Sequence, residues 1–221
     1  MTGFSQPVQT PPDYPDDAFV VKYDANGNVK WASDIGGYKA MGLALAVSSA
    51  GNVSVTGFVG NIGGGTAQQG ETVVTSQPAG TITSLGTGHH TSPYNRDLIL
   101  LTYDSSGVLL TSTRKGGVNH EAGSGIGSSG GDVYVAVDTE DASTSANALL
   151  VAKYTGTTAD WARTAPGAGT DAFEQNTKLS VAPGGIILVT GWFTDSATFG
   201  GVTLNSQGAE DMFFARLRTP N

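Results

Sequence analysis

A chain of 221 residues can bury a sizeable core, and the complete lack of cysteine excludes disulfides and thiolate metal sites. Only 14% of the residues are charged and glycine occurs 32 times, a composition typical of an all-β protein with many turns. The net charge of -8 is spread without acidic blocks, which argues against nucleic acid or an anionic membrane as a partner. No window approaches the roughly 18 apolar residues of a membrane span.

Residues 1–16 contain four prolines and few apolar residues, so an extended arm or linker is expected there in preference to a packed element. The stretch has neither a basic beginning nor a long apolar run, and as it stands it is not a secretory signal.

The segment from Asp17 to Gly37 predicts a hairpin. Its first half, up to Tyr23, is apolar on both alternating faces, and such a strand must be covered on both sides. Asn26 and Gly27 then supply the positive φ that a tight turn needs, and Val29 to Ile35 runs back.

A second kind of strand pair follows, with Met41 to Val47 and Val53 to Phe58 as its two strands. The first strand alternates small residues with larger ones, which suits a strand crowded near a central axis. Equivalent pairs return around the turns at Gly130-Gly131 and at Pro183-Gly184-Gly185.

These patterns repeat along the chain. Variants of the first hairpin begin at Asp97 and Ala148, and a truncated one begins at Asp211. The repeating unit therefore has four strands, with the small-residue strand first and the doubly apolar strand third. The expected domains are an arm over 1–16 and repeats over 17–221, divided into a partial unit 17–37, a unit 38–116 with an insertion at 60–96, a unit 117–165 and a partial unit 171–217.

No helix is predicted that could cover the doubly apolar strands, so each sheet must be covered by another copy of itself. Sheets arranged in this way around an axis form a β-propeller-type array of four-stranded antiparallel blades, here an incomplete ring within one chain. A β-sandwich is the rival architecture, although it does not explain the constant strand order.

The run DAFVVKYDANGNVKWASDIGG followed by LAVSSAGNVSVTGF, together with FTDSATFGGVTLNSQGAEDMFFARL, resembles the seven-bladed β-propeller type repeat of bacterial secreted and surface proteins. The resemblance covers nearly everything from Asp17 onward. It implies the fold, a secreted or cell-surface location, and a binding or surface module without family-wide catalytic residues. The chain departs from the pattern of this repeat at two places. Thr111 occupies the position in its unit that Trp31 has in the first unit, and the 60–96 insertion is unusually long.

An unclosed array exposes a sheet edge and an apolar flank. The chain is therefore either a fragment of a longer protein, half of a ring that two chains complete, or a subunit that adds head to tail into a filament. The residues expected to mediate self-association are apolar and lie in the third strands of the two partial units: Phe19, Val21, Met212, Phe213 and Phe214.

No catalytic, metal or cofactor site is predicted. His89, His90 and His120 lack the spacing of a metal site, and the glycine-rich stretches lack the context of a phosphate loop. Asp24 and Asp104 are explained as turn formers whose side chains bind local backbone N–H groups. An enzyme remains the alternative, with a carboxylate site assembled across blades from Glu121, Asp171 and Glu174.

The predicted function is a non-enzymatic scaffold outside the cytoplasm that recognises a protein or a glycan, or assembles with its own copies. Trp31 and Trp161 are expected to pack between blades, with a sugar-stacking platform as the alternative. Candidate ligand-binding residues lie mainly in the polar insertion, which is long and attached to a rigid scaffold. They are His89, His90, Tyr94 and Asn95 of the insertion, and Trp192 at the end of a later strand.

Overall fold

The computed structural model describes residues 2–5, 17–35, 40–60, 74–77, 80–82, 96–115, 120–140, 147–167 and 177–218. Every helix or strand assigned within these ranges is a β-strand, which confirms the all-β prediction. The strands are β1 (Thr2–Ser5), β2 (Asp17–Tyr23), β3 (Val29–Ile35), β4 (Met41–Val47), β5 (Val53–Gly60), β6 (Val74–Gln77), β7 (Gly80–Ile82), β8 (Arg96–Tyr103), β9 (Leu109–Lys115), β10 (His120–Ser129), β11 (Asp132–Glu140), β12 (Asn147–Thr155), β13 (Thr158–Pro166), β14 (Lys178–Ala182), β15 (Ile186–Phe193), β16 (Ser196–Phe199), β17 (Val202–Asn205) and β18 (Asp211–Arg218).

The strands form separate antiparallel sheets in the predicted strand order. The second sheet is β4-β5-β8-β9 and the third is β10-β11-β12-β13, so each holds one complete four-stranded unit. The fourth sheet, β14-β15-β18, holds the three strands expected of the last unit, and β16 and β17 form a small sheet of their own. The doubly apolar strands β2, β8, β12 and β18 therefore lie in four different sheets.

The first sheet is wider than the predicted hairpin, with the order β1-β2-β3-β6-β7. Residues 2–5, expected to belong to an extended arm, pair as β1 with β2, and the Thr2 hydroxyl donates a hydrogen bond to the Phe19 carbonyl at 2.8 Å. The insertion at 60–96 contributes β6 and β7, and β6 pairs with β3. An isolated hairpin leaves backbone groups unpaired along both edges, and these additions pair them.

The strand registers show that the repeats share the same structure. Each pairing of a third with a fourth strand shifts register at the same place, between Lys22 and Tyr23 in the first sheet and at the equivalent positions of the second and third. The turns repeat as well. Asp24 Oδ1 accepts hydrogen bonds from the backbone N–H groups of Asn26 and Asn28, and Gly27 takes a φ of 84°. Asp104 does the same in the next unit, which confirms both aspartates as turn formers.

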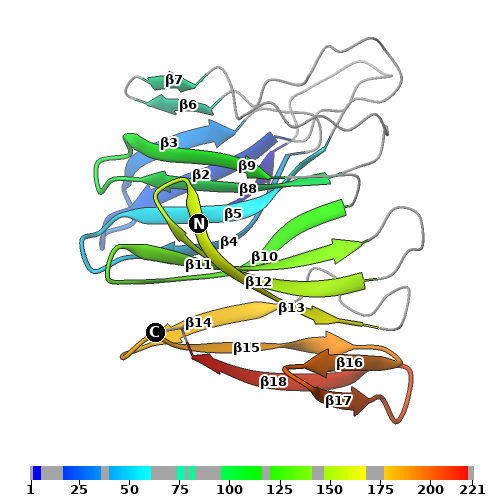
Figure 1. The fold of residues 1–221 in the computed structure, drawn as a ribbon. Coiled ribbons are helices and arrows are strands. Elements are labelled where there is room, and N and C mark those ends of the chain that lie inside the picture. Colours follow the sequence, from blue (N-terminus) through cyan, green and yellow to red (C-terminus); the bar gives the residue numbers. More distant parts are fainter. Residues whose placement is uncertain are drawn as a thin grey trace, which may run out of the picture.

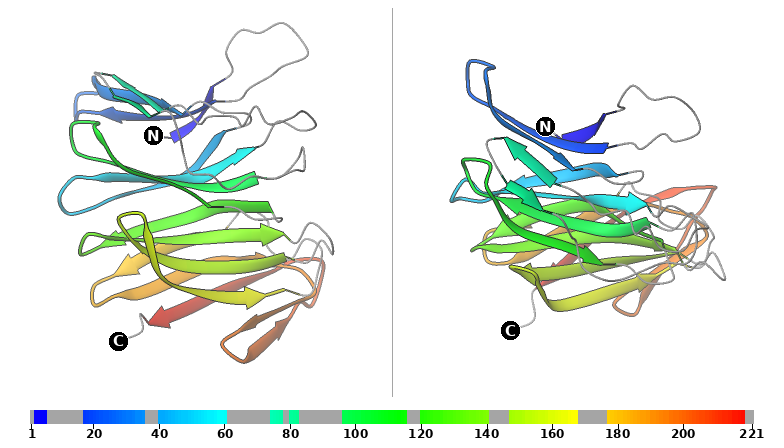
Figure 2. Two further views of the ribbon diagram at one scale, coloured as in Figure 1. Left: turned by 45° about the horizontal axis from the view of Figure 1, so that its top comes forward. Right: turned by 90° about the horizontal axis from the view of Figure 1, so that it is seen from above.

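The sheets stack face to face in chain order, from the first at the top of Figure 1 to the fourth at the bottom. Figure 2 shows the same succession from two further directions. Three apolar clusters fill the spaces between successive sheets, one for each space. β8 and β12 are thus covered on both sides by other sheets, as their sequence requires, whereas among the described residues β2 and β18 are covered by another sheet on one side only.

The first strands of successive sheets lie against one another: β10 contacts β4 on one side and β14 on the other. Their small residues make this approach possible. A Cβ atom on Gly123 would lie 1.9 Å from the hydroxyl oxygen of Thr56 on β5, the strand beside β4, and one on Gly125 would lie 2.8 Å from the backbone nitrogen of Leu179 on β14. The crowding predicted for the small-residue strand is therefore present in β10.

Trp31 packs between the first and second sheets, as predicted. It is 4% exposed, its ring lies 5.5 Å from that of Tyr103, and its indole N–H donates to the Ser105 carbonyl at 3.3 Å. Trp161, at the equivalent position of the third sheet, packs against the cluster facing the fourth sheet but stays half-buried. The two tryptophans thus occupy matching places with different degrees of burial.

Candidate functional site

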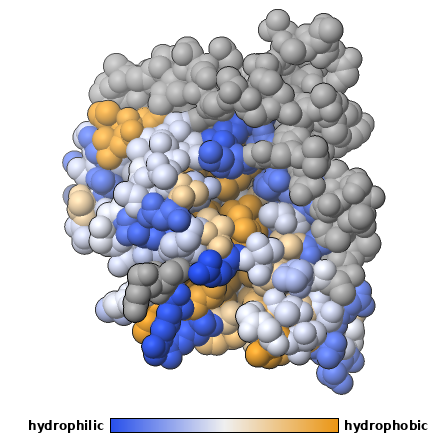
Figure 3. Space-filling view, viewed as in Figure 1, coloured by the Kyte–Doolittle hydropathy of each residue, from blue (hydrophilic) through white to orange (hydrophobic). Residues whose placement is uncertain are grey.

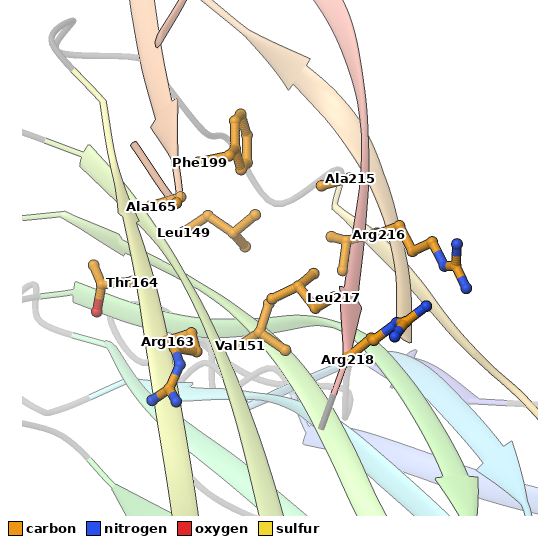
Figure 4. Close-up of a pocket in the computed structure, with 12 residues that line it drawn as sticks. Leu149, Val151, Arg163, Thr164, Ala165, Phe199, Ala215, Arg216, Leu217 and Arg218 are labelled. Atoms are coloured by element: carbon orange, nitrogen blue, oxygen red, sulfur yellow. The ribbon is translucent and has the colours of Figure 1, made fainter. Parts of the chain in front are cut away.

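A pocket of about 270 Å³ opens between the third and fourth sheets. Its walls are apolar. Leu149 and Val151 of β12 face Leu217 of β18 across it, and Phe199 closes one end, as Figure 4 shows. The remaining lining residues are Arg163, Thr164, Ala165, Val189, Gly200, Ala215, Arg216 and Arg218.

Three arginines border this pocket. Arg163 lies on the wall formed by β13, whereas Arg216 and Arg218 project from β18 on the side away from Leu149 and Val151 (Figure 4). Arg163 donates to the Ala162 carbonyl at 3.1 Å, and its guanidinium lies 6.0 Å from the centre of the Trp161 ring. In the space-filling view of Figure 3, apolar surface near the centre of this face is bordered by hydrophilic side chains.

The two ends of the sheet stack expose apolar side chains. We define the N-terminal end face by Phe19, Val21 and Tyr23 of β2, of which Tyr23 is 47% exposed. The strand registers make Tyr23 equivalent to Tyr103, which is fully buried between the first and second sheets. In the second sheet this side of the third strand is covered by the preceding sheet. In the first sheet the described residues include no preceding sheet to cover it.

The C-terminal end face lies on the outer side of the fourth sheet. It is defined by Met212, 80% exposed, Phe214, 68% exposed, and the half-buried Trp192, which lies directly opposite Met212. The residues equivalent to Met212 and Phe214 are Leu149 and Val151 in the third sheet, and both are buried against the fourth. Trp192, predicted as a ligand-binding residue, thus lies on this end face.

Phe213 differs from the other residues predicted for self-association. It is 2% exposed and its ring lies 4.9 Å from that of Phe199, within the cluster between the third and fourth sheets. Because side chains alternate along a strand, its neighbours Met212 and Phe214 point outward while Phe213 points inward. Phe213 is therefore a core residue of this chain and not a surface contact.

Most residues predicted for ligand binding or for a carboxylate site lie outside the described residues: His89, His90, Tyr94, Asn95, Asp171 and Glu174. Glu121 is described, and it is the second residue of β10. Within the described ranges no three histidine or acidic side chains are grouped so that they could hold a metal ion. Nor does this part of the chain contain a helix able to cross a membrane.

Asp138 is a buried carboxylic acid that the sequence analysis missed. It lies on β11, is 6% exposed, and accepts a hydrogen bond from the Thr177 hydroxyl at 2.8 Å. Burial raises its pKa to about 6, and Ser124, Thr177 and Lys178 only partly oppose that shift. The register makes Asp138 equivalent to Phe58 of the second sheet, so a comparison of the repeats position by position would have marked it as an exception.

This burial predicts a dependence of stability on pH. The folded state disfavours the carboxylate, so the penalty is absent below the unfolded pKa near 3.8, grows as the pH rises, and is complete above about 6. Replacing Asp138 by asparagine removes this penalty. The unfolding free energy of the Asp138→Asn variant, relative to that of the wild type, is expected to increase by roughly 2 kcal/mol between pH 4 and pH 7.

Urea denaturation of both proteins at each pH measures this difference directly. Asp195→Asn, which removes an exposed carboxylate, is the control for the loss of one charge. A difference between wild type and Asp138→Asn that stays constant from pH 4 to pH 7 would contradict the prediction.

Asp97 is a second buried acid, and it forms an ion pair with Arg114 across β8 and β9. Its position in the apolar run from Asp97 to Tyr103 was noted in the sequence only as the start of a strand. The partner on the neighbouring strand could not be inferred, because it depends on the register.

The chain was also compared with known proteins. No family model matches it, and no curated protein matches it. The function must therefore be inferred from the arrangement of its own residues.

Proposed function

We propose that this chain is a non-enzymatic scaffold of the β-propeller type that acts outside the cytoplasm and is completed by further copies of itself. The resemblance of its repeats to those of bacterial secreted and surface proteins supports the location and the architecture. The stacked sheets with crowded first strands support a radial arrangement, since their contacts concentrate along β4, β10 and β14.

One observation carries the proposal: the two end faces are the two halves of an interface that the chain already uses inside itself. Between the third and fourth sheets, Leu149 and Val151 of one sheet cover Phe213, Ala215 and Leu217 of the next. By register, Met212 and Phe214 are equivalent to Leu149 and Val151. The residues of the N-terminal end face are equivalent to Phe213, Ala215 and Leu217. The C-terminal end face of one copy therefore fits the N-terminal end face of another.

A polar contact supports the same pairing. Lys22 of the first sheet donates a hydrogen bond to the Ser105 carbonyl in the turn of the second sheet, at 2.8 Å. Arg216 is equivalent to Lys22, and Ala25 is equivalent to Ser105. In the assembly the Arg216 guanidinium of one copy would donate to the Ala25 carbonyl of the next.

The proposal predicts that the wild-type protein self-associates and that Met212→Ser with Phe214→Ser makes it monomeric. Both side chains are mostly exposed in the single chain, so the variant is expected to fold. Sedimentation velocity over a range of concentrations measures the effect. Val202→Ser with Leu204→Ser is the matched control, because it removes two exposed apolar residues of β17 that belong to neither end face.

A mixing experiment tests whether unlike faces meet. A second variant, with Phe19, Val21 and Tyr23 each replaced by serine, keeps only its C-terminal end face. Each variant alone is expected to be monomeric, and an equimolar mixture is expected to give one-to-one complexes. A wild-type protein that remains monomeric near 1 mM, or a mixture of the two variants that forms no complex, would refute the proposal.

A further inference from the structure

The last sheet lacks the fourth strand that the other units have. In the second and third sheets the third strand pairs with a fourth, β8 with β9 and β12 with β13. In the fourth sheet the order ends at β18, which pairs with β15 on its other side. Among the described strands none pairs with the outer edge of β18, and a sheet edge of this kind is a template for a further strand.

The pocket described above lies directly behind this edge. In the space between the first and second sheets, the corresponding place is filled in part by Leu109, which the fourth strand β9 directs inward. The fourth sheet has no such strand, and an apolar pocket of about 270 Å³ remains between Leu149, Val151 and Leu217. The pocket thus lies where a fourth strand of the fourth sheet would place its inward side chains.

The opposite side of β18 belongs to the C-terminal end face, and beyond Met212 and Phe214 it carries two cationic side chains. Arg216 and Arg218 are exposed on that side, and no acidic side chain of the described residues forms an ion pair with either. A strand paired with β18 would direct alternate side chains to opposite faces of the sheet. Those facing inward would enter the apolar pocket, and those facing outward would lie beside Arg216 and Arg218.

We propose that the edge of β18 binds an extended peptide segment in which apolar and acidic residues alternate, as a fourth strand of the last sheet. Main-chain hydrogen bonds to β18 supply affinity, the pocket selects the apolar side chains, and the arginines select the carboxylates. This site lies at the edge of the sheet, whereas the proposed self-association uses its outer face. Both use Arg216, so the site is tested in a variant that does not self-associate as well as in the wild type.

Binding can be tested with the peptide Val-Asp-Val-Asp-Val-Asp and the control peptide Val-Lys-Val-Lys-Val-Lys, by calorimetry and by amide hydrogen exchange. The protein is used both as wild type and as the Met212→Ser, Phe214→Ser variant, so that a failure of self-association is separated from a failure of this site. The acidic peptide is expected to bind and to slow exchange at Ala215 to Arg218, whereas the basic peptide is not.

Arg216→Glu with Arg218→Glu reverses the charge at two exposed positions and is expected to fold. It is expected to weaken binding of the acidic peptide at least about tenfold, since two charge pairs are lost and two repulsions are added. The control Arg96→Glu changes a cation on the second sheet, over Phe58, and is expected to leave binding unchanged. No binding of the acidic peptide, equal binding of both peptides, or protection confined to other strands would overturn the inference.

Discussion

Replacing Gly125 by alanine is expected to lower the free energy of unfolding by about 2 kcal/mol. The added Cβ would lie 2.8 Å from the backbone nitrogen of Leu179 and 2.9 Å from the backbone oxygen of Thr177, in the sheet packed against β10. Both are backbone atoms, which cannot rotate away, so the third and fourth sheets would have to separate. Urea denaturation measures the change.

The expected change in the free energy of unfolding is opposite in sign to the usual effect of replacing glycine by alanine. Alanine in place of a glycine without contacts generally stabilises, by about 0.5 to 1 kcal/mol, because it restricts the unfolded chain. Gly208 provides this comparison, since a Cβ there would meet no atom within 4 Å. If Gly125→Ala is as stable as Gly208→Ala, the close approach of the first strands does not exist in solution.

Trp31→Ala is expected to cost about 4 kcal/mol of unfolding free energy. The substitution removes a buried ring that contacts Tyr103 and lies on Gly107, where a Cβ would come within 2.7 Å of the indole. It also leaves the Ser105 carbonyl without the indole donor. The cavity would lie between the first and second sheets, so the measurement also reports how firmly these sheets are joined.

Trp161→Ala is the matched comparison, because the registers place both tryptophans at one position of the unit. Trp161 is only half-buried, and its loss is expected to cost about 1 to 2 kcal/mol. Equal losses for the two variants would mean that Trp31 does not hold two sheets together.

The burial of two acidic residues could not be predicted from the sequence. Asp138 follows an apolar run and resembles the polar end of an exposed strand, yet it is buried and hydrogen-bonded to Thr177, which directly precedes β14. Asp97 similarly begins a strand and is buried with Arg114. Both environments are created by neighbouring strands that are distant along the chain, and for this reason alternation within one segment could not reveal them.

The amino-acid sequence by itself determined the strands of the repeating unit, their turns and their order within each unit, but not β1, β6, β7, β16 and β17. These depend on local properties: the alternation of apolar residues from Asp17 to Tyr23, the aspartate that binds its own turn, and the glycine that adopts a positive φ. The separation of the four doubly apolar strands into four sheets also followed, because such a strand buries its apolar faces against other sheets and not beside another copy in its own sheet.

Only the tertiary structure decided how the edges are used. The outer edges of β2, β3 and β18 could each pair with a further strand. β1 pairs with β2 and β6 pairs with β3, whereas no described strand pairs with the outer edge of β18. The pocket beside Leu217 and the two exposed end faces follow from these choices. Backbone hydrogen bonds are nearly alike for every edge, so the choice among edges is made by the packing of side chains from distant segments, which a local pattern does not contain.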